Sequence, residues 1–178
     1  MEIDLFYFKN FAGKSGGKTS VEYSIMKDQF LEIRNYIDEI KLDQHEGYFE
    51  YDHFPFINNI LQDLTAKQQD DFVEEVFKWT DFQMYIVSWF LHSTNFILQG
   101  KYDSDYVFCE CFAKIDNVEY LEYLYQDLEL HLMQRKFFKN DLSLSLQDII
   151  NNLYLLINYL RDENSIDFCL KIIENIDN

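Results

Sequence analysis

The residues with the most recognisable pattern for chemistry lie near the N-terminus, in the segment AGKSGGKT (residues 12–19). It satisfies the loose phosphate-loop pattern, in which backbone N–H groups of a glycine-rich turn contact phosphate oxygens. Gly17 would permit close approach, Lys18 would supply charge and Thr19 would hold Mg²⁺. Such loops join a strand of a parallel sheet to a helix. The sequence after Thr19 predicts helices and not the further strands that such a sheet needs. A nucleotide-binding enzyme is therefore the alternative, and a polar loop ending in a helix cap is preferred.

Carboxylates form a second group of candidates, on two predicted helices. The acids concerned are Asp70, Asp71, Glu74 and Glu75 on one helix, and Glu119, Glu122, Asp127 and Glu129 on the other. They alternate with apolar residues, so we expect most of them in water rather than in a buried catalytic pair. We assign no catalytic residue and interpret these acids as a surface for a basic partner.

Tyrosine accompanies acids at two further places. Tyr51 lies among Glu46, Glu50 and Asp52, and Tyr102 precedes Asp103 and Asp105. Tyr is a frequent anchor at protein interfaces, and carboxylates complement Lys and Arg. We predict that these residues also bind the partner, although many of the rings will fill the core instead.

Metal and nucleophile patterns are weak. Glu50 and His53 have the spacing of a di-iron motif, but such sites need a second copy and two more carboxylates. Cys109 and Cys111 would point apart on a helix. His92 and His131 lie among large apolar residues and are interpreted as packed or surface histidines. The sequence therefore predicts no metal site and no cofactor.

Composition limits the partners. The 178 residues carry a formal net charge of -17, with 48% hydrophobic and 18% aromatic residues. Such a chain can bury a core, but it repels phosphate backbones and anionic lipid, so we expect neither direct nucleic-acid binding nor membrane binding. Three cysteines suit a reducing compartment. Residues 85–98 are too short and polar to span a membrane, and no signal peptide is evident, so we expect a cytoplasmic protein.

The elements that position these residues are predicted to be helical. One proline and five glycines in the chain favour an all-α fold, with residues 2–8 suited to a short strand. Capping boxes begin at Thr19, Thr65 and Thr80, and Asn117 can cap a further helix. The helix after Thr80 is expected to reach about Gln99 and stop at Gly100.

The resulting prediction is one helical domain over residues 1–178, with residues 1–18 as an extended Gly/Lys-rich segment. It is an irregular bundle of about eight antiparallel helices joined by short links.

The chain resembles bacterial immunity proteins, which neutralise toxins of contact-dependent inhibition and other polymorphic toxin systems. The resemblance lies in the length, the acidic body and the segments YFEYDHF (48–54) and VEYLEYLYQDLEL (118–130). It implies a non-enzymatic protein that covers the active-site cleft of a basic toxin, most often a nuclease acting on RNA or DNA. An acidic helical adaptor or scaffold is a further alternative, and the oligomeric state stays open.

Overall fold

The computed structural model describes residues 20–40, 49–94, 96–138 and 142–177. Within them lie eight α-helices: α1 (Ser20–Glu39), α3 (Phe54–Gln62), α4 (Ala66–Val76), α5 (Asp81–Thr94), α6 (Ser104–Lys114), α7 (Val118–Met133), α8 (Leu146–Tyr159) and α9 (Glu163–Asp177). A π-helical turn, η1 (Phe49–His53), and a 3-10 turn, η2 (Arg135–Phe137), complete the elements. No strand occurs in these ranges, which confirms the predicted all-α fold.

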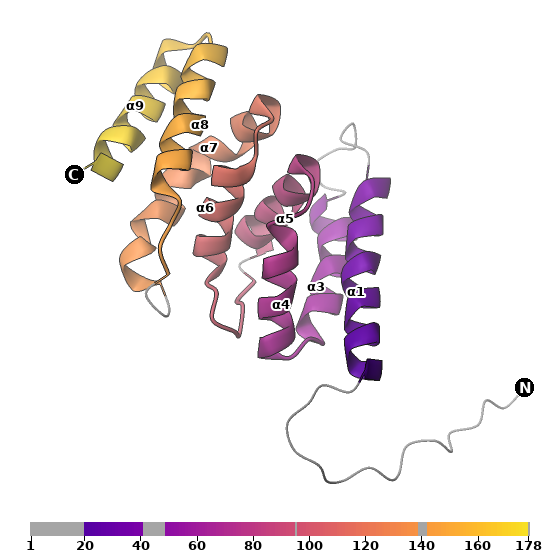
Figure 1. Cartoon of the computed structure of the whole chain (residues 1–178). Coiled ribbons are helices and arrows are strands. Elements are labelled where there is room, and N and C mark those ends of the chain that lie inside the picture. The colour runs from indigo at the N-terminus through magenta and orange to yellow at the C-terminus, as the bar shows by residue number, and fades with distance from the viewer. Residues whose placement is uncertain (1–19, 41–48, 95, 139–141, 178) are drawn as a thin grey trace, which may run out of the picture.

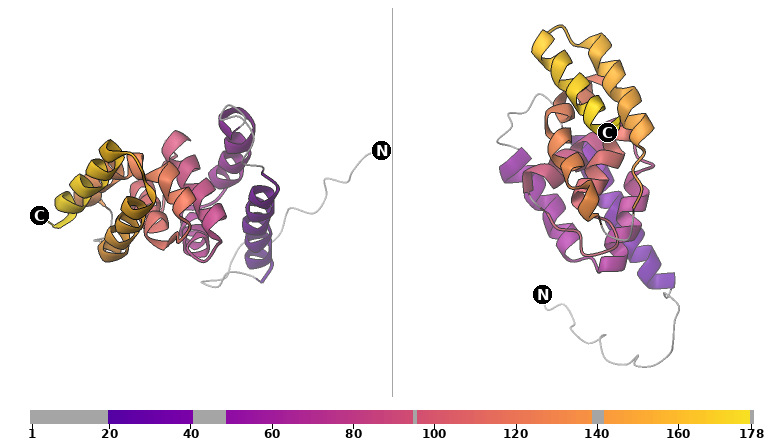
Figure 2. Two further views of the ribbon diagram at one scale, coloured as in Figure 1. Left: turned by 90° about the horizontal axis from the view of Figure 1, so that it is seen from above. Right: turned by 90° about the vertical axis from the view of Figure 1, so that its left-hand side faces the viewer.

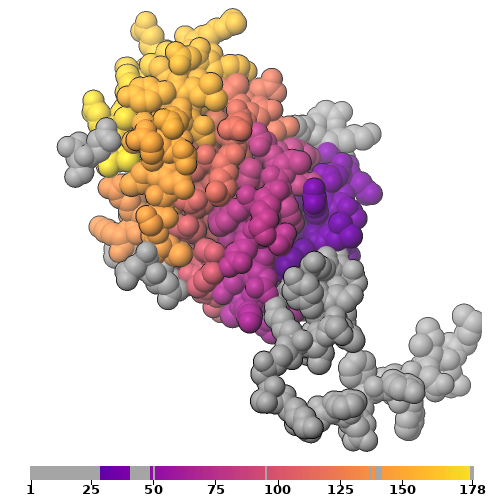
Figure 3. Space-filling model, in the orientation of Figure 1, coloured from indigo at the N-terminus to yellow at the C-terminus, as the bar shows by residue number. Residues whose placement is uncertain are grey.

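The helices follow one another along the molecule, from α1 at one end to α9 at the other (Figures 1 and 2). The space-filling view shows the same order on its surface (Figure 3). Helix α5 contacts α1, α4, α6 and α7, while α8 contacts α6, α7 and α9. Elements that are close in sequence are therefore close in space, as the short connections predicted.

Some sequence predictions lie outside the described residues. These are the strand over residues 2–8, the phosphate-loop residues Gly17, Lys18 and Thr19, and the acid Glu46. The parallel sheet that a phosphate loop requires is not found in the described part of the chain. None of the described helices has both the length and the apolar character needed to cross a bilayer.

Helix starts follow the predicted caps. Thr65 Oγ1 accepts from Gln68 N at 3.4 Å, and Gln68 Oε1 accepts from Thr65 N at 2.9 Å. Thr80 and Gln83 make the same reciprocal pair at 3.4 and 3.1 Å. Asn117 Oδ1 accepts from the backbone N–H two residues later at 2.9 Å. Each cap satisfies donors that the first helical turn leaves without partners, so these three starts are fixed locally.

Buried polar side chains join helices that are distant in sequence. The Asn152 amide of α8 donates to the carbonyl oxygens of Phe112 at 2.7 Å, Ile115 at 3.0 Å and Ala113 at 3.3 Å. It thereby satisfies carbonyls at the C-terminal end of α6 that have no partner within that helix. The buried Glu110 of α6 accepts from the backbone N–H of Ser145, where α8 begins. These bonds fix α8 against α6.

The predicted end of the helix after Thr80 is wrong. Helix α5 ends at Thr94, and residues 96–99 form no regular element, with Phe96 and Leu98 buried while Ile97 is exposed. The buried Gln69 of α4 holds this segment, because its Oε1 accepts from Gln99 N at 2.7 Å. Tertiary contact with α4 therefore outweighs the helical tendency of this sequence.

Gly100 is a point of close approach, not the helix stop that the sequence predicted. A Cβ atom at this position would lie 2.5 Å from Asp70 Cγ and 2.7 Å from the Ala66 carbonyl oxygen. The next residue, Lys101, donates its backbone N–H to Asp70 Oδ1 at 2.7 Å. Only glycine lets this backbone lie directly on α4.

Gly100→Ala is therefore expected to lower the free energy of unfolding by about 2 kcal/mol, because the added methyl group must push backbone away from backbone. Urea unfolding measures this change. Lys101→Ala is the control, since it keeps the N–H bond to Asp70 and should have a much smaller effect. Equal losses for the two variants would contradict the close approach.

The three cysteines are buried thiols. Burial raises the pKa of Cys111 from 9.0 to about 12 and that of Cys169 to about 11, and raises that of Cys109 as well. A thiol-specific reagent such as DTNB should therefore leave all three unmodified at pH 8 in the folded chain and modify all three in urea. Since folding opposes ionisation, the free energy of unfolding should fall as the pH rises from 9 toward 12. Rapid modification of the folded chain would contradict this burial.

Candidate functional site

The acids predicted on α4 have partners within the chain. They are Asp70, Asp71, Glu74 and Glu75. Lys101 Nζ lies 2.7 Å from Glu74 Oε1, Lys78 Nζ lies 2.8 Å from Glu75 Oε1, and Asp70 holds the backbone of residue 101. The hydrogen bond that Lys101 donates to Glu74 raises the pKa of Lys101. Asp71 is half-buried on the same helix. Three of these four acids therefore also have a role within the fold, and Glu74 and Glu75 remain exposed.

The predicted group of Tyr102, Asp103 and Asp105 does not form one exposed surface in the structure. Tyr102 is buried and stacks on Tyr106, with 5.7 Å between ring centroids, so it belongs to the core. Asp103 and Asp105 lie at the start of α6, where negative charge favours the helix N-terminus. Asp105 accepts a hydrogen bond from the buried His131, and this contact was not predicted.

The predicted residues Glu50, Tyr51 and Asp52 lie in the turn η1. Tyr51 and Asp52 are exposed, as an interface would require. Glu50 lies in the same turn, but its side chain is outside the part that the structure describes. His53 Nδ1 lies 2.9 Å from the Tyr36 hydroxyl, and burial lowers the pKa of His53. His53 therefore contacts α1 through this ring nitrogen.

The outward side of α7 combines acids with exposed apolar side chains. We define the α7 outer face as Glu119, Glu122, Tyr123, Gln126, Leu130 and Met133, which are all exposed. Spacings of three and four residues place them along one side of the helix. Tyr123 is 66% exposed, Leu130 55% and Met133 65%. Large apolar groups grouped on one face in this way are typical of interaction surfaces.

Aromatic contacts hold the start of this face against α5. Tyr85 stacks on Tyr120 with 5.3 Å between centroids and 9° between planes, and Tyr123 lies 5.8 Å from Tyr85. The ring contacts continue from Tyr85 to Trp89 at 5.9 Å and from Trp89 to Phe49 at 4.4 Å. They therefore connect the α7 outer face to η1, which carries the other exposed Tyr and acid predicted from the sequence.

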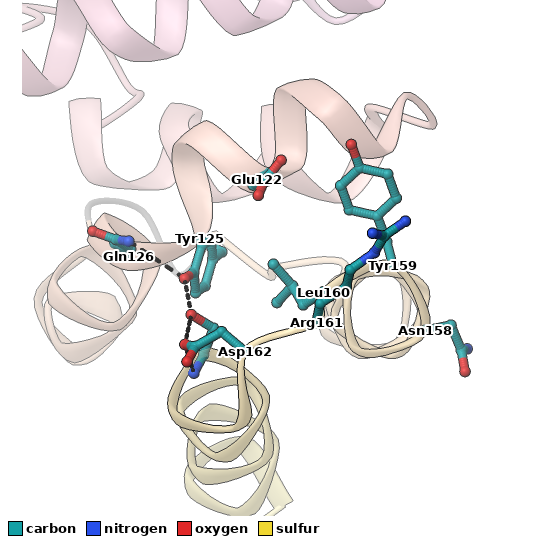
Figure 4. Close-up of a pocket in the computed structure, with 9 residues that line it drawn as sticks. Glu122, Tyr125, Gln126, Asn158, Tyr159, Leu160, Arg161 and Asp162 are labelled. Atoms are coloured by element: carbon teal, nitrogen blue, oxygen red, sulfur yellow. Dashed lines mark hydrogen bonds between the residues drawn. The ribbon is translucent and has the colours of Figure 1, made fainter.

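Hollows border α7 among the residues that the structure describes. One of about 810 Å³ lies between Glu122 and Gln126 on α7 and Arg161 after α8 (Figure 4). A second, of about 450 Å³, is lined by Leu130, and a third, of about 400 Å³, by Met133. Exposed side chains that alternate with hollows give a surface into which a partner's side chains can insert.

Hydrogen bonds join Tyr125, Ser165 and Asp162, which line the hollow of about 810 Å³. Tyr125 Oη donates to Ser165 Oγ at 2.9 Å, and Ser165 Oγ donates to Asp162 Oδ2 at 2.7 Å (Figure 4). The Ser165 backbone N–H donates to the same carboxylate at 2.8 Å. Hydrogen bonds from Ser165 lower the pKa of Asp162. Asp162 thus caps α9, and the hollow is a fixed feature of the junction between α7 and α9.

Glu119 and Glu122 were predicted from the sequence as partner-binding residues, whereas Tyr123, Leu130 and Met133 were not. The signal was present, because these residues repeat the spacing of the acids on the same helix. The apolar character of this segment is explained by a buried row of leucines, Leu121, Leu124, Leu128 and Leu132. The exposed apolar residues on the other side of the helix were therefore not recognised from the sequence.

Comparison of the chain with protein-family models, curated proteins and solved structures finds no match.

Proposed function

We propose that this chain is a non-enzymatic, cytoplasmic binding protein that neutralises a basic protein toxin through the α7 outer face. The observation that carries the proposal is the exposure of Tyr123, Leu130 and Met133 beside Glu119 and Glu122. Apolar anchors supply binding free energy once water is excluded, and acids at the rim select a positively charged partner. The net charge of -17 also favours a positively charged partner.

A nuclease is the toxin class that fits best. A nuclease must present positive charge to its phosphate substrate, and a strongly acidic protein is complementary to that cleft. Charge of this magnitude also speeds association toward about 10⁸ M⁻¹s⁻¹ at low salt, which lets the protein reach a toxin before it acts. The resemblance to immunity proteins supports the same class of partner.

The exposed apolar side chains of the α7 outer face could serve as the anchors of a tight complex. A standard interface of about 1,600 Å² draws most of its affinity from a few aromatic and aliphatic anchors. Tyr123 packs against Tyr85 with a 40° tilt between the ring planes, so less conformational freedom is lost when it is buried against a partner. The α7 outer face therefore provides a pre-organised centre with acids around it.

The proposal is tested by capture of the partner from the native host with the tagged chain at low salt, followed by elution at high salt and mass spectrometry. We expect one basic protein that is toxic when expressed alone and harmless when expressed with this chain. A stable complex with a harmless protein would instead identify an adaptor. Elution that does not depend on salt would contradict the electrostatic part of the proposal.

A further inference from the structure

The outward side of α8 carries almost no charge. Residues 149–160 contain no acidic or basic side chain, although the chain has a net charge of -17. Tyr154 is 49% exposed, Leu155 42% and Tyr159 44%. The α8 outer face is defined by exposed residues along one side of the helix, which are Gln147, Asp148, Asn151, Tyr154, Leu155, Asn158 and Tyr159. Because α8 lies at the surface of the molecule (Figures 1 and 3), this uncharged face meets water in the single chain.

A neutral face of this composition suits a second copy of the same chain. A basic partner gains from acids, and on this face Asp148 is the one acid. Two copies of a chain with a net charge of -17 repel each other, so they associate most readily where few acids face one another. A two-fold interface must in addition be complementary to itself, since the same surface supplies both sides.

The ends and the centre of the α8 outer face meet this second requirement. If two α8 helices lie antiparallel about an axis between Tyr154 and Leu155, Tyr154 of each copy faces Leu155 of the other. At equal distances outward from the axis, Asp148 of each copy faces Arg161 of the other. Arg161 is exposed just after the end of α8, and neither Arg161 nor Asp148 forms an ion pair with another described residue. Opposite charges therefore meet at both ends of an apolar centre.

The two asparagines of this face are complementary in their available atoms. Asn151 Oδ1 accepts from Gln147 Nε2 at 3.2 Å, which leaves the Asn151 NH₂ group available to donate. Asn158 Nδ2 donates to the carbonyl oxygen of Tyr154 at 2.9 Å, which leaves Asn158 Oδ1 available to accept. In the same antiparallel arrangement Asn151 of each copy faces Asn158 of the other. The symmetry therefore brings a donor to an acceptor twice.

We propose that two copies of this chain associate through the α8 outer face, with their α8 helices antiparallel about a two-fold axis between Tyr154 and Leu155. Apolar contact at the centre drives the association, and the pairs of Asp148 with Arg161 select the antiparallel orientation. The inference does not rest on the proposed function, and no residue of the α7 outer face belongs to this surface. A single helix face is a small interface, so the dimer is weak and depends on concentration.

Sedimentation velocity of the full chain over a range of concentrations tests the proposal. We expect a monomer–dimer equilibrium with a dissociation constant of about 50 μM. Salt screens the repulsion between two acidic copies, so the dimer fraction should rise between about 0.05 M and about 0.5 M NaCl. This salt effect is opposite to that expected for a basic partner. A chain that remains monomeric up to about 1 mM at both salt concentrations would overturn the proposal.

Two variants with the same change of charge locate the interface. Leu155→Lys brings two ammonium groups close together at the axis and should weaken the dimer by about tenfold or more. Leu31→Lys makes the same substitution at a leucine of α1 that is 51% exposed, at the other end of the molecule, and should dimerise like the wild type. Equal dimerisation of the two variants would place the contact elsewhere and overturn the proposal. Thermal unfolding verifies that each variant is folded.

A charge exchange tests the antiparallel pairing itself. Asp148→Arg and Arg161→Asp each place like charges opposite one another and should weaken the dimer about threefold to tenfold. The double variant restores opposite charges and keeps the net charge of the wild type, so its dissociation constant should return to within about twofold of the wild-type value. A double variant that dimerises no better than the weaker single variant would overturn the pairing of Asp148 with Arg161, and with it the proposed dimer.

Discussion

Replacing Tyr123 with alanine is expected to weaken binding of the basic partner by about thirtyfold, or about 2 kcal/mol, as for other aromatic anchors at interface centres. The ring is exposed in the free protein but held against Tyr85, so truncation removes contact area without opening the core. Calorimetric titration with the purified partner measures the change. We expect the loss to appear mainly as faster dissociation.

Tyr154→Ala is the matched control for this variant. Tyr154 is an exposed tyrosine on α8, outside the α7 outer face, and its loss should leave affinity unchanged. Charge reversal at Glu119 and Glu122 should slow association and reduce its dependence on salt. If Tyr123→Ala bound normally while Tyr154→Ala did not, the binding surface would have to be moved to α8.

Replacing Asn152 with leucine is expected to cost about 3 kcal/mol of stability. The variant keeps the size of the side chain but removes the donor that serves three carbonyl oxygens at the end of α6. Buried carbonyls left without a partner each carry a desolvation penalty. Burial of the apolar leucine side chain offsets only part of that penalty. Urea unfolding should show a lower midpoint with an unchanged slope.

Asn158→Leu provides the comparison on the same helix. Asn158 is exposed, and its amide donates only to the carbonyl oxygen of Tyr154, one turn earlier. Water can replace that bond, so we expect a change within about 0.5 kcal/mol. Similar losses for both variants would mean that the helix tolerates leucine poorly, and that the bonds to α6 are unimportant.

Local features of the fold could be predicted from the sequence, because their causes are local. The pairs Thr65–Gln68 and Thr80–Gln83 form within one helical turn, and spacing alone identifies them. The end of α5 could not be predicted in this way. It depends on Gln69, a side chain thirty positions away that binds the backbone of Gln99.

The candidate site was predicted in part for the same reason. Glu119 and Glu122 are exposed acids on a helix whose buried row is evident from its leucines. By contrast, the contacts of Asp70 and Glu74 with residue 101, and of Asp105 with His131, join segments separated by more than twenty positions. No spacing rule reveals such pairs, so the sequence does not distinguish acids with partners inside the fold from acids that stay exposed.

The order of the helices along the molecule has a kinetic consequence. Most of the described helices pack mainly on elements near them in sequence, and the main contacts of α1 are with α3 and α5. Chains with such local contacts close only short loops on the way to the native state and typically fold within microseconds to milliseconds. Synthesis at about 5–20 residues per second is far slower, so each helix can dock soon after it leaves the ribosome. We therefore expect newly made chains to become competent for binding almost as soon as their translation ends.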